Sequence, residues 1–184
     1  MAAIASLCVF CGSQTGRNPA YAAVARSLGA ALAQRRITLV YGAGGIGLMG
    51  VVADAVLAGG GKAIGVIPEK LESLEVAHPG LTETVVTKDM FRRKRIMLDR
   101  ADGFVILPGG YGTLDEFFEV LTWKQLGLLD KPIVVLDSEG YWGPLLDLLD
   151  QVSAEGFAPP ATSGLATVVN SIDELFIALD NGEA

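Results

Sequence analysis

The sequence has little of several residue types and patterns on which common functions depend. Charged residues make up only 19% of the 184 residues, and the net charge of -7 argues against a nucleic-acid polymer as partner. The longest apolar stretches are interrupted by glycine, proline or charge before they reach a membrane-spanning length, so we expect no contact with a membrane. The first ten residues lack a basic segment and are expected to form a strand, not a signal peptide.

Cysteine is equally scarce. Cys8 and Cys11 are the only two, which leaves no disulfide framework and favours a reducing cytoplasm. Their spacing superficially suggests a redox or metal pair. They lie on a predicted strand, however, where residues three apart point to opposite faces. A shared disulfide or metal is therefore not expected, and no other feature calls for a metal or cofactor.

Short Val/Ile/Leu segments alternate with helical patterns along the chain. Strands are predicted at residues 6–10, 37–41, 63–67, 84–87, 104–107, 133–136 and 166–169, and helices at 21–35, 48–57, 90–100, 114–126, 141–154 and 172–179. The strands lack clean polar alternation, which is typical of parallel strands buried on both faces. We therefore expect an α/β fold, a Rossmann-like doubly wound and mainly parallel sheet flanked by helices, as one nucleotide-binding domain over residues 1–184.

Three of the predicted strands are followed by glycine-bearing loops. These loops are residues 11–16, 42–47 and 108–112. Because parallel strands end at one edge of the sheet, we expect the loops to line one crevice, with Ser13, Gly44 and Gly109 among the residues on it. The second loop also satisfies G-x-G-x-x-G, which is a weak signal by itself. A dinucleotide site requires an acidic residue at the end of the next strand, and here that strand ends in Pro68-Glu69. A dehydrogenase is therefore compatible with the pattern but is not favoured by it.

The third loop, Pro-Gly-Gly-Tyr-Gly-Thr-Leu-Asp-Glu at residues 108–116, carries the most information. A strand that turns at glycines into a helix presents backbone N–H groups and a helix dipole to an anion such as phosphate. Glu116 has two interpretations. It can complete a capping box with Thr113, as Ser171 and Glu174 do before the last predicted helix, or it can serve in catalysis beside a bound phosphate.

A basic segment at residues 90–97, Met-Phe-Arg-Arg-Lys-Arg-Ile-Met, is the second chemical feature. A solvated basic helix face is the simpler interpretation. At 100° per residue, however, Lys94 falls within the apolar stripe and Arg93 at its edge, whereas Arg95 lies opposite. Two cations then point inward, where a phosphate, a sugar hydroxyl or Glu116 can pair with them.

These motifs resemble the LOG (lonely guy) family of cytokinin riboside 5'-monophosphate phosphoribohydrolases, whose members have also been described as lysine decarboxylases. The resemblance covers nearly the whole chain and rests above all on the loop at 108–116 together with the upstream Arg93-Lys94 pair. It implies hydrolysis of the N-glycosidic bond of N6-modified adenosine 5'-monophosphates, AMP itself included as a possible substrate, to free base and ribose 5-phosphate. It also implies a homodimer and no metal or cofactor.

The resemblance assigns roles to individual residues. Arg93 and Glu116 are implied to be catalytic. The residues implied to contact the nucleotide are Glu75, Lys94, Gly110, Tyr111, Gly112, Thr113, Leu114, Asp115 and Thr122. Where the family has Met-His-Glu-Arg-Lys, this chain has Phe91 and Arg92 in place of His and Glu, and Ala43 replaces a usual glycine.

Three further expectations follow from the sequence. A non-catalytic nucleotide or cofactor carrier with the same phosphate-binding fold is the alternative function, because fold alone does not fix function. No lysine is marked as the Schiff-base residue that a pyridoxal-phosphate decarboxylase requires. In the predicted helix at 114–126, Phe117, Phe118, Leu121 and Trp123 cover more than one face, which favours either an isologous dimer or cover by a second helix of the same chain.

Overall fold

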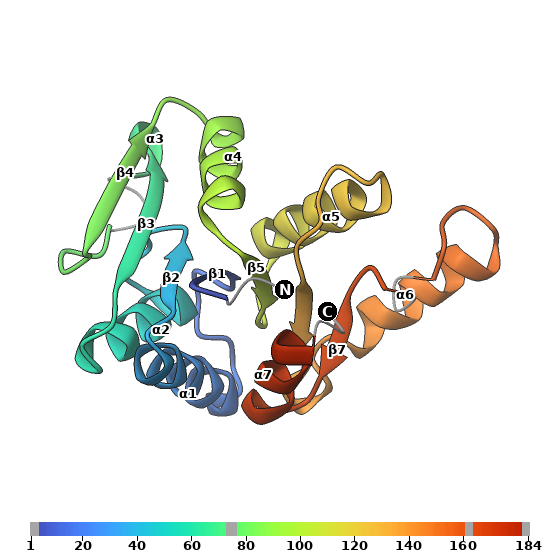
Figure 1. Ribbon diagram of the computed structural model, residues 1–184, viewed down its shortest axis with the longest axis horizontal. Coiled ribbons are helices and arrows are strands. Elements are labelled where there is room, and N and C mark those ends of the chain that lie inside the picture. The colour runs from blue at the N-terminus through green and yellow to red at the C-terminus, as the bar shows by residue number, and fades with distance from the viewer. Residues whose placement is uncertain (1–3, 73–76, 161–163, 182–184) are drawn as a thin grey trace.

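The structure, a computed structural model, describes residues 4–72, 77–160 and 164–181. Within these residues, seven parallel strands form one sheet in the order β4-β3-β2-β1-β5-β6-β7 (Figure 1). The strands are β1 (Ser6–Phe10), β2 (Thr38–Tyr41), β3 (Ala63–Pro68), β4 (Glu83–Thr87), β5 (Gly103–Ile106), β6 (Ile133–Leu136) and β7 (Thr167–Val169). The predicted Rossmann-like α/β fold is confirmed.

Helices cover both faces of the sheet. They are α1 (Pro19–Arg35), α2 (Gly47–Ala58), α3 (Glu69–Glu72), α4 (Met90–Arg100), α5 (Tyr111–Gln125), α6 (Gly143–Ala154) and α7 (Ile172–Asn181), with a 3-10 turn η1 (Ser138–Gly140) before α6. One hydrophobic core joins α1, α2 and α7 to the sheet, and a second joins α4, α5 and α6 to its other face.

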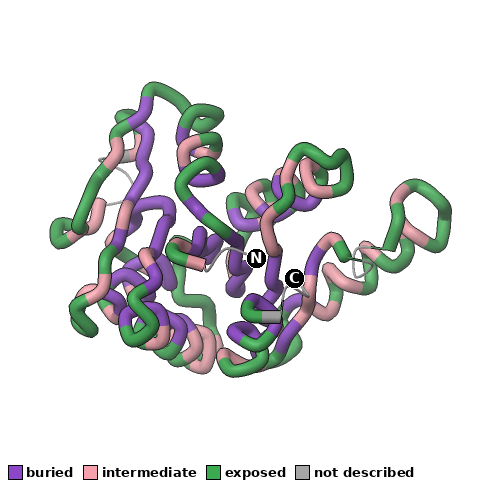
Figure 2. The backbone as a smooth tube through the Cα atoms, viewed as in Figure 1, coloured by how far each residue is buried: buried purple, intermediate pink, exposed green. Residues whose placement is uncertain are grey.

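The central strand β1 shows how the sequence builds two cores at once. Leu7 and Val9 face the core of α1, α2 and α7, whereas Cys8 and Phe10 face the core of α4 and α5, and all four are buried. Side chains of a strand alternate between faces, so a strand covered on both sides must be apolar throughout. Figure 2 shows buried residues concentrated on the strands and on the inward helix faces.

The cysteines follow this alternation. Cys8 belongs to one core and Cys11 to the other, and both are buried free thiols. The prediction that they share no disulfide is confirmed. Among the residues that the structure describes, no helix has both the length and the apolar character needed to cross a bilayer.

The order of the strands determines where a ligand can bind. β1 pairs with β2 on one side and with β5 on the other. The chain therefore adds β2, β3 and β4 on one side of β1 and then crosses to its other side to add β5, β6 and β7. In open α/β sheets the crevice at such a switch point, beyond the carboxyl ends of the strands, is the usual ligand site.

Two elements differ from the sequence prediction by more than two residues. The first is α3, a single turn in a region where the sequence analysis predicted neither a helix nor a strand. The second is α5, which begins at Tyr111 rather than near Leu114, with Gly110 as its N-cap. Glycine is tolerated there because the first residues of a helix have no intrahelical acceptor for their N–H groups.

Candidate active site

A cavity of about 320 Å³ opens at the carboxyl ends of β1, β2 and β5. It lies at the switch point of the sheet, where the glycine loops were predicted to meet. Its walls come from the loop after β1, the end of β2, the turn α3, the start of α4 and the first turns of α5. The lining residues are Val9, Cys11, Gly12, Ser13, Gly42, Met49, Leu71, Met90, Arg93, Gly110, Tyr111, Gly112, Thr113, Asp115 and Glu116.

The N-terminus of α5 forms one wall of this cavity. Gly110 is the N-cap residue, and no side chain caps the helix. A Cβ atom added at Gly110 or Gly112 would meet no atom within 4 Å, so both glycines border open space. The first N–H groups and the dipole of this 15-residue helix therefore face a volume that an anion can fill.

Glu116 lies in the second turn of α5 and lines the same cavity. The capping-box interpretation is wrong, because Thr113 is the third residue of the helix and not its cap. Thr113 is instead buried beneath Gly109, where an added Cβ would lie 2.0 Å from the Thr113 hydroxyl oxygen. At the start of α7 the same pattern does cap, since the Ser171 hydroxyl accepts a bond from the Glu174 N–H at 3.2 Å.

The negative charge of Glu116 affects the pKa of both cysteine thiols. Burial raises the pKa of Cys8 well above its ordinary value, and the negative charge of Glu116 adds to the shift. Burial and the same carboxylate also raise the pKa of Cys11. Both thiols therefore stay protonated at neutral pH and do not provide a nucleophile.

Arg93 points inward from α4, as the helical stripe predicted, and is only 5% exposed. Its Nε donates to the backbone oxygen of Val66 at 3.0 Å, and its Nη2 donates to the backbone oxygen of Gly42, also at 3.0 Å. A Cβ atom at residue 42 would lie 2.0 Å from Nη2, so only glycine leaves room for the guanidinium. Arg93 is thereby fixed as a buried cation on the cavity wall.

Lys94 also points inward, but toward α5 rather than into the cavity. Its Nζ lies 3.1 Å from Asp115 Oδ2 and 2.9 Å from Glu119 Oε2. Burial lowers the pKa of Lys94, but the hydrogen bonds and charges of Glu119 and Asp115 outweigh it and leave the pKa above its ordinary value. Arg93 and Lys94 are adjacent on α4, as Asp115 and Glu116 are on α5, so the lysine holds together the two helices that carry Arg93 and Glu116.

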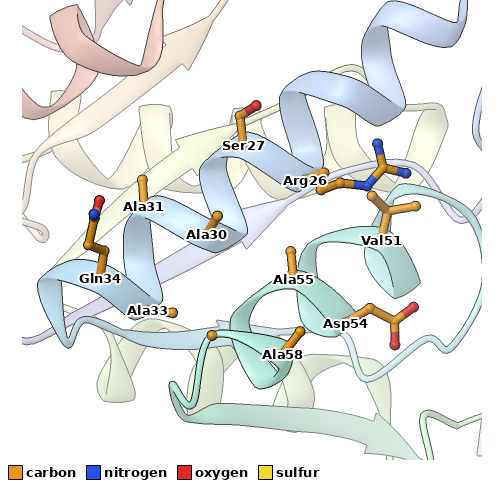
Figure 3. Close-up of a pocket in the computed structure, with 11 residues that line it drawn as sticks. Arg26, Ser27, Ala30, Ala31, Ala33, Gln34, Val51, Asp54, Ala55 and Ala58 are labelled. Carbon is orange, nitrogen blue, oxygen red and sulfur yellow. The ribbon is translucent and has the colours of Figure 1, made fainter.

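A more open hollow of about 920 Å³ lies between α1 and α2, two of the helices that cover one face of the sheet (Figure 3). Small residues dominate its lining, Ala30 and Ala31 on α1 and Ala55 and Ala58 on α2 among them. It brings together no buried charge, so its size alone does not make it a candidate for chemistry.

Comparison with known proteins identifies the family of this chain. The family model described as "Possible lysine decarboxylase" matches residues 49–179. Cytokinin riboside 5'-monophosphate phosphoribohydrolase of Rhodococcoides fascians is 45% identical over 175 residues, which cover 95% of this chain and 88% of that protein. The chain belongs to the LOG family.

A second LOG-family relative is the Arabidopsis thaliana protein LOG7, also named as a cytokinin riboside 5'-monophosphate phosphoribohydrolase. It is 44% identical over 177 residues, covering 96% of this chain and 82% of that protein. Among solved structures, the molybdenum cofactor carrier protein of Chlamydomonas reinhardtii superposes with a TM-score of 0.74 over 96% of both chains at 21% identity. A likeness at that identity shows the fold alone.

The LOG-family description as a possible lysine decarboxylase finds no support in the cavity. Among the described residues, no lysine lines it. A Schiff-base lysine needs a lowered pKa, whereas the pKa of Lys94 is raised.

The structure brings together most of the residues that the LOG-family resemblance implied, but not all. Ser13, Arg93 and Glu116 line the cavity. Five other predicted residues do not line it. Gly44 is buried against Met49, Leu114 packs toward the core of α4 and α5, and Thr122 is exposed on the outer side of α5. Lys94 takes part only through Asp115, and Gly109 lines an adjoining, smaller cavity. Glu75 lies outside the described residues.

Some cavity residues were not predicted as site residues. Met49, Leu71 and Met90 give the cavity an apolar wall. Met90 was predicted only as the first residue of the basic segment at 90–97, and Leu71 lies on the one-turn helix α3, which was not predicted. An apolar side chain carries no sequence signal that distinguishes a ligand wall from the core.

The glycines of the G-x-G-x-x-G pattern serve the protein rather than a dinucleotide. Gly42 makes room for Arg93, and a Cβ at Gly47 would lie 2.2 Å from the backbone carbon of Ser13. Ala43, which stands where the family usually has glycine, adopts a left-handed φ of 67°. That conformation costs an alanine about 1 kcal/mol, which a glycine would not incur.

Proposed function

We propose that this protein hydrolyses the N-glycosidic bond of N6-modified adenosine 5'-monophosphates, releasing the free base and ribose 5-phosphate. The observation that carries the proposal is the presence, in one cavity, of an uncapped helix N-terminus and a carboxylate one turn further along. The names of the LOG-family relatives at 44–45% identity support the same reaction.

The phosphate end of the substrate binds at the start of α5. Backbone N–H groups of residues 110–113 and the helix dipole favour a dianion there. Binding energy from this group, which does not react, then orients the ribose toward Glu116.

The chemistry requires a carboxylate near the anomeric carbon. Cleavage passes through an oxocarbenium-like sugar, which the negative charge of Glu116 stabilises. The adenine base leaves with the electron pair of the N-glycosidic bond and takes up a proton. Water adds to C1' and gives a proton to the Glu116 carboxylate, which acts as the general base. The buried Arg93 places a positive charge on the cavity wall. Its role is to hold the sugar hydroxyls and the Glu116 carboxylate in position relative to each other.

The decisive experiment is chromatography of the products formed from N6-isopentenyl-AMP and, separately, from AMP. We expect free base and ribose 5-phosphate in equal amounts from the N6-modified substrate, and the ratio of the two kcat/KM values defines the substrate range. Tight binding of both nucleotides without release of base would contradict hydrolysis and favour the carrier function.

We further propose that two chains form a homodimer through the outer face of α5. Phe117 and Leu121 are buried in their own core, but Tyr111 is 93% exposed and Phe118 is 38% exposed. At 100° per residue, Tyr111, Phe118 and Thr122 share one exposed stripe of α5 that starts at the cavity. An isologous contact along this stripe would bring Thr122 of one chain toward the cavity of the other.

Light scattering at micromolar concentration tests this interface. We expect a dimer for the wild type, and a monomer with reduced kcat/KM for Phe118→Asp. Phe157→Asp is the matched control, because Phe157 is 84% exposed beyond the end of α6. A wild-type protein that is both monomeric and fully active would exclude the dimer.

We also propose a cytoplasmic location. Cys8 and Cys11 are free, buried thiols, and the fold uses no disulfide between them. A protein of this kind is compatible with a reducing compartment.

A further inference from the structure

A smaller cavity of about 260 Å³ adjoins the candidate active site and shares Gly12, Ser13 and Gly110 with it. One wall is Tyr141, which follows the turn η1 beyond the end of β6. The Tyr141 hydroxyl donates a hydrogen bond to the backbone oxygen of Gly109. The side chain of Tyr141, from the segment between β6 and α6, is thus hydrogen-bonded to the loop that leads into α5.

The Tyr141 ring is itself held in place. Tyr21 packs edge-on against it with ring centroids 5.4 Å apart, and Trp142 does so at 4.7 Å. The backbone N–H of Trp142 donates to Asp137 Oδ1 at 2.7 Å, which fixes the corner between β6 and α6. Tyr141 therefore reaches Gly109 from a rigid support.

The bond to Gly109 has a consequence for the next residue. In a planar trans peptide, the C=O of Gly109 and the N–H of Gly110 point in opposite directions. With the carbonyl turned toward Tyr141, the Gly110 N–H points away from it, and Gly110 lines the larger cavity, which Tyr141 does not line. On the other side of the loop, the Gly12 N–H donates to the oxygen of Pro108 at 3.0 Å, so the loop is held at two successive carbonyls.

We propose that Tyr141 is a positioning residue: by holding the Gly109 carbonyl, it aims the Gly110 N–H at the phosphate of the substrate. This inference rests on the proposed function only for the identity of the anion. Tyr141 lines the smaller cavity and not the one that holds Arg93 and Glu116, so we expect its effect to be confined to ligands that carry a phosphate.

The test compares Tyr141→Phe with Tyr21→Phe, which removes a hydroxyl from the same cavity without touching Gly109. Calorimetry measures the affinity of each purified protein for AMP, ribose 5-phosphate and adenosine, and NMR follows the Gly110 amide. For Tyr141→Phe we expect about tenfold weaker binding of both phosphates, unchanged binding of adenosine and a shifted Gly110 resonance. Tyr21→Phe should match the wild type in all four measurements.

Wild-type affinity of Tyr141→Phe for both phosphates would overturn the inference. Equal weakening for AMP and adenosine would also overturn it, because that result indicates general damage to the cavity. Neither measurement requires turnover. A wild-type protein that binds both AMP and N6-isopentenyl-AMP and releases base from neither would refute the proposed reaction, while the role of Tyr141 would still be decided by the binding data.

Discussion

Glu116→Gln is expected to lower kcat by about 10²-fold or more while changing KM little. Glutamine keeps the size of the side chain but neither stabilises a developing positive charge at C1' nor accepts a proton from water. Because Glu116 lies in the second turn of α5 and does not cap the helix, the thermal midpoint should stay near that of the wild type. Steady-state release of base from N6-isopentenyl-AMP provides the measurement.

Glu155→Gln makes the same chemical change at an exposed position just after α6 and serves as the control. Both variants should bind ribose 5-phosphate as the wild type does, because the N-terminus of α5 is unaltered. If Glu116→Gln kept most of its activity, the carboxylate would have no part in the chemical step.

Arg93→Ala is expected to lower kcat/KM by about 10²-fold or more, whereas Arg95→Ala should retain nearly wild-type kinetics. Arg93 is buried on the cavity wall, but Arg95 is exposed and pairs with Asp99 at 3.0 Å one turn along the same helix. The two substitutions remove the same charge from neighbouring positions, so the comparison isolates the direction of the side chain.

Arg93→Ala also leaves the backbone oxygens of Val66 and Gly42 without their guanidinium donor, which will cost some stability. Arg93→Lys separates this effect from catalysis. Lysine restores a charge but cannot donate to both oxygens in the same fork, and we expect it to recover thermal stability more than kcat. Equal kcat/KM for Arg93→Ala and Arg95→Ala would contradict the inward placement.

The sequence was sufficient to predict the positions of the strands and which face of α4 points toward the protein interior. Buried parallel strands are short, continuous apolar runs, and the predicted boundaries lie within one residue of the observed ones. The stripe on α4 placed Arg93 inside and Arg95 outside because helical periodicity alone determines the face.

Contacts between helices were beyond the reach of such patterns. Lys94 was expected at the nucleotide, but its partners Asp115 and Glu119 lie on another helix, and no spacing along the chain encodes how α4 packs against α5. The start of α5 was placed too late because glycine reads as loop, although Gly112 is tolerated in a first turn. Thr122 follows the helix periodicity outward, so its predicted contact requires a second chain.

The pairing of β1 with β5 has a consequence for how the protein acquires its activity. Leu7 pairs with Gly103, nearly a hundred residues further along, and the loop at residues 108–116 comes only after that strand. Closing so long a segment is entropically costly, and folds rich in such distant contacts form slowly. During synthesis, β2 becomes available to β1 early, but the second neighbour of β1, strand β5, is made only after residue 100. Recovered turnover therefore reports completion of the native topology, and not merely collapse of the amino-terminal half.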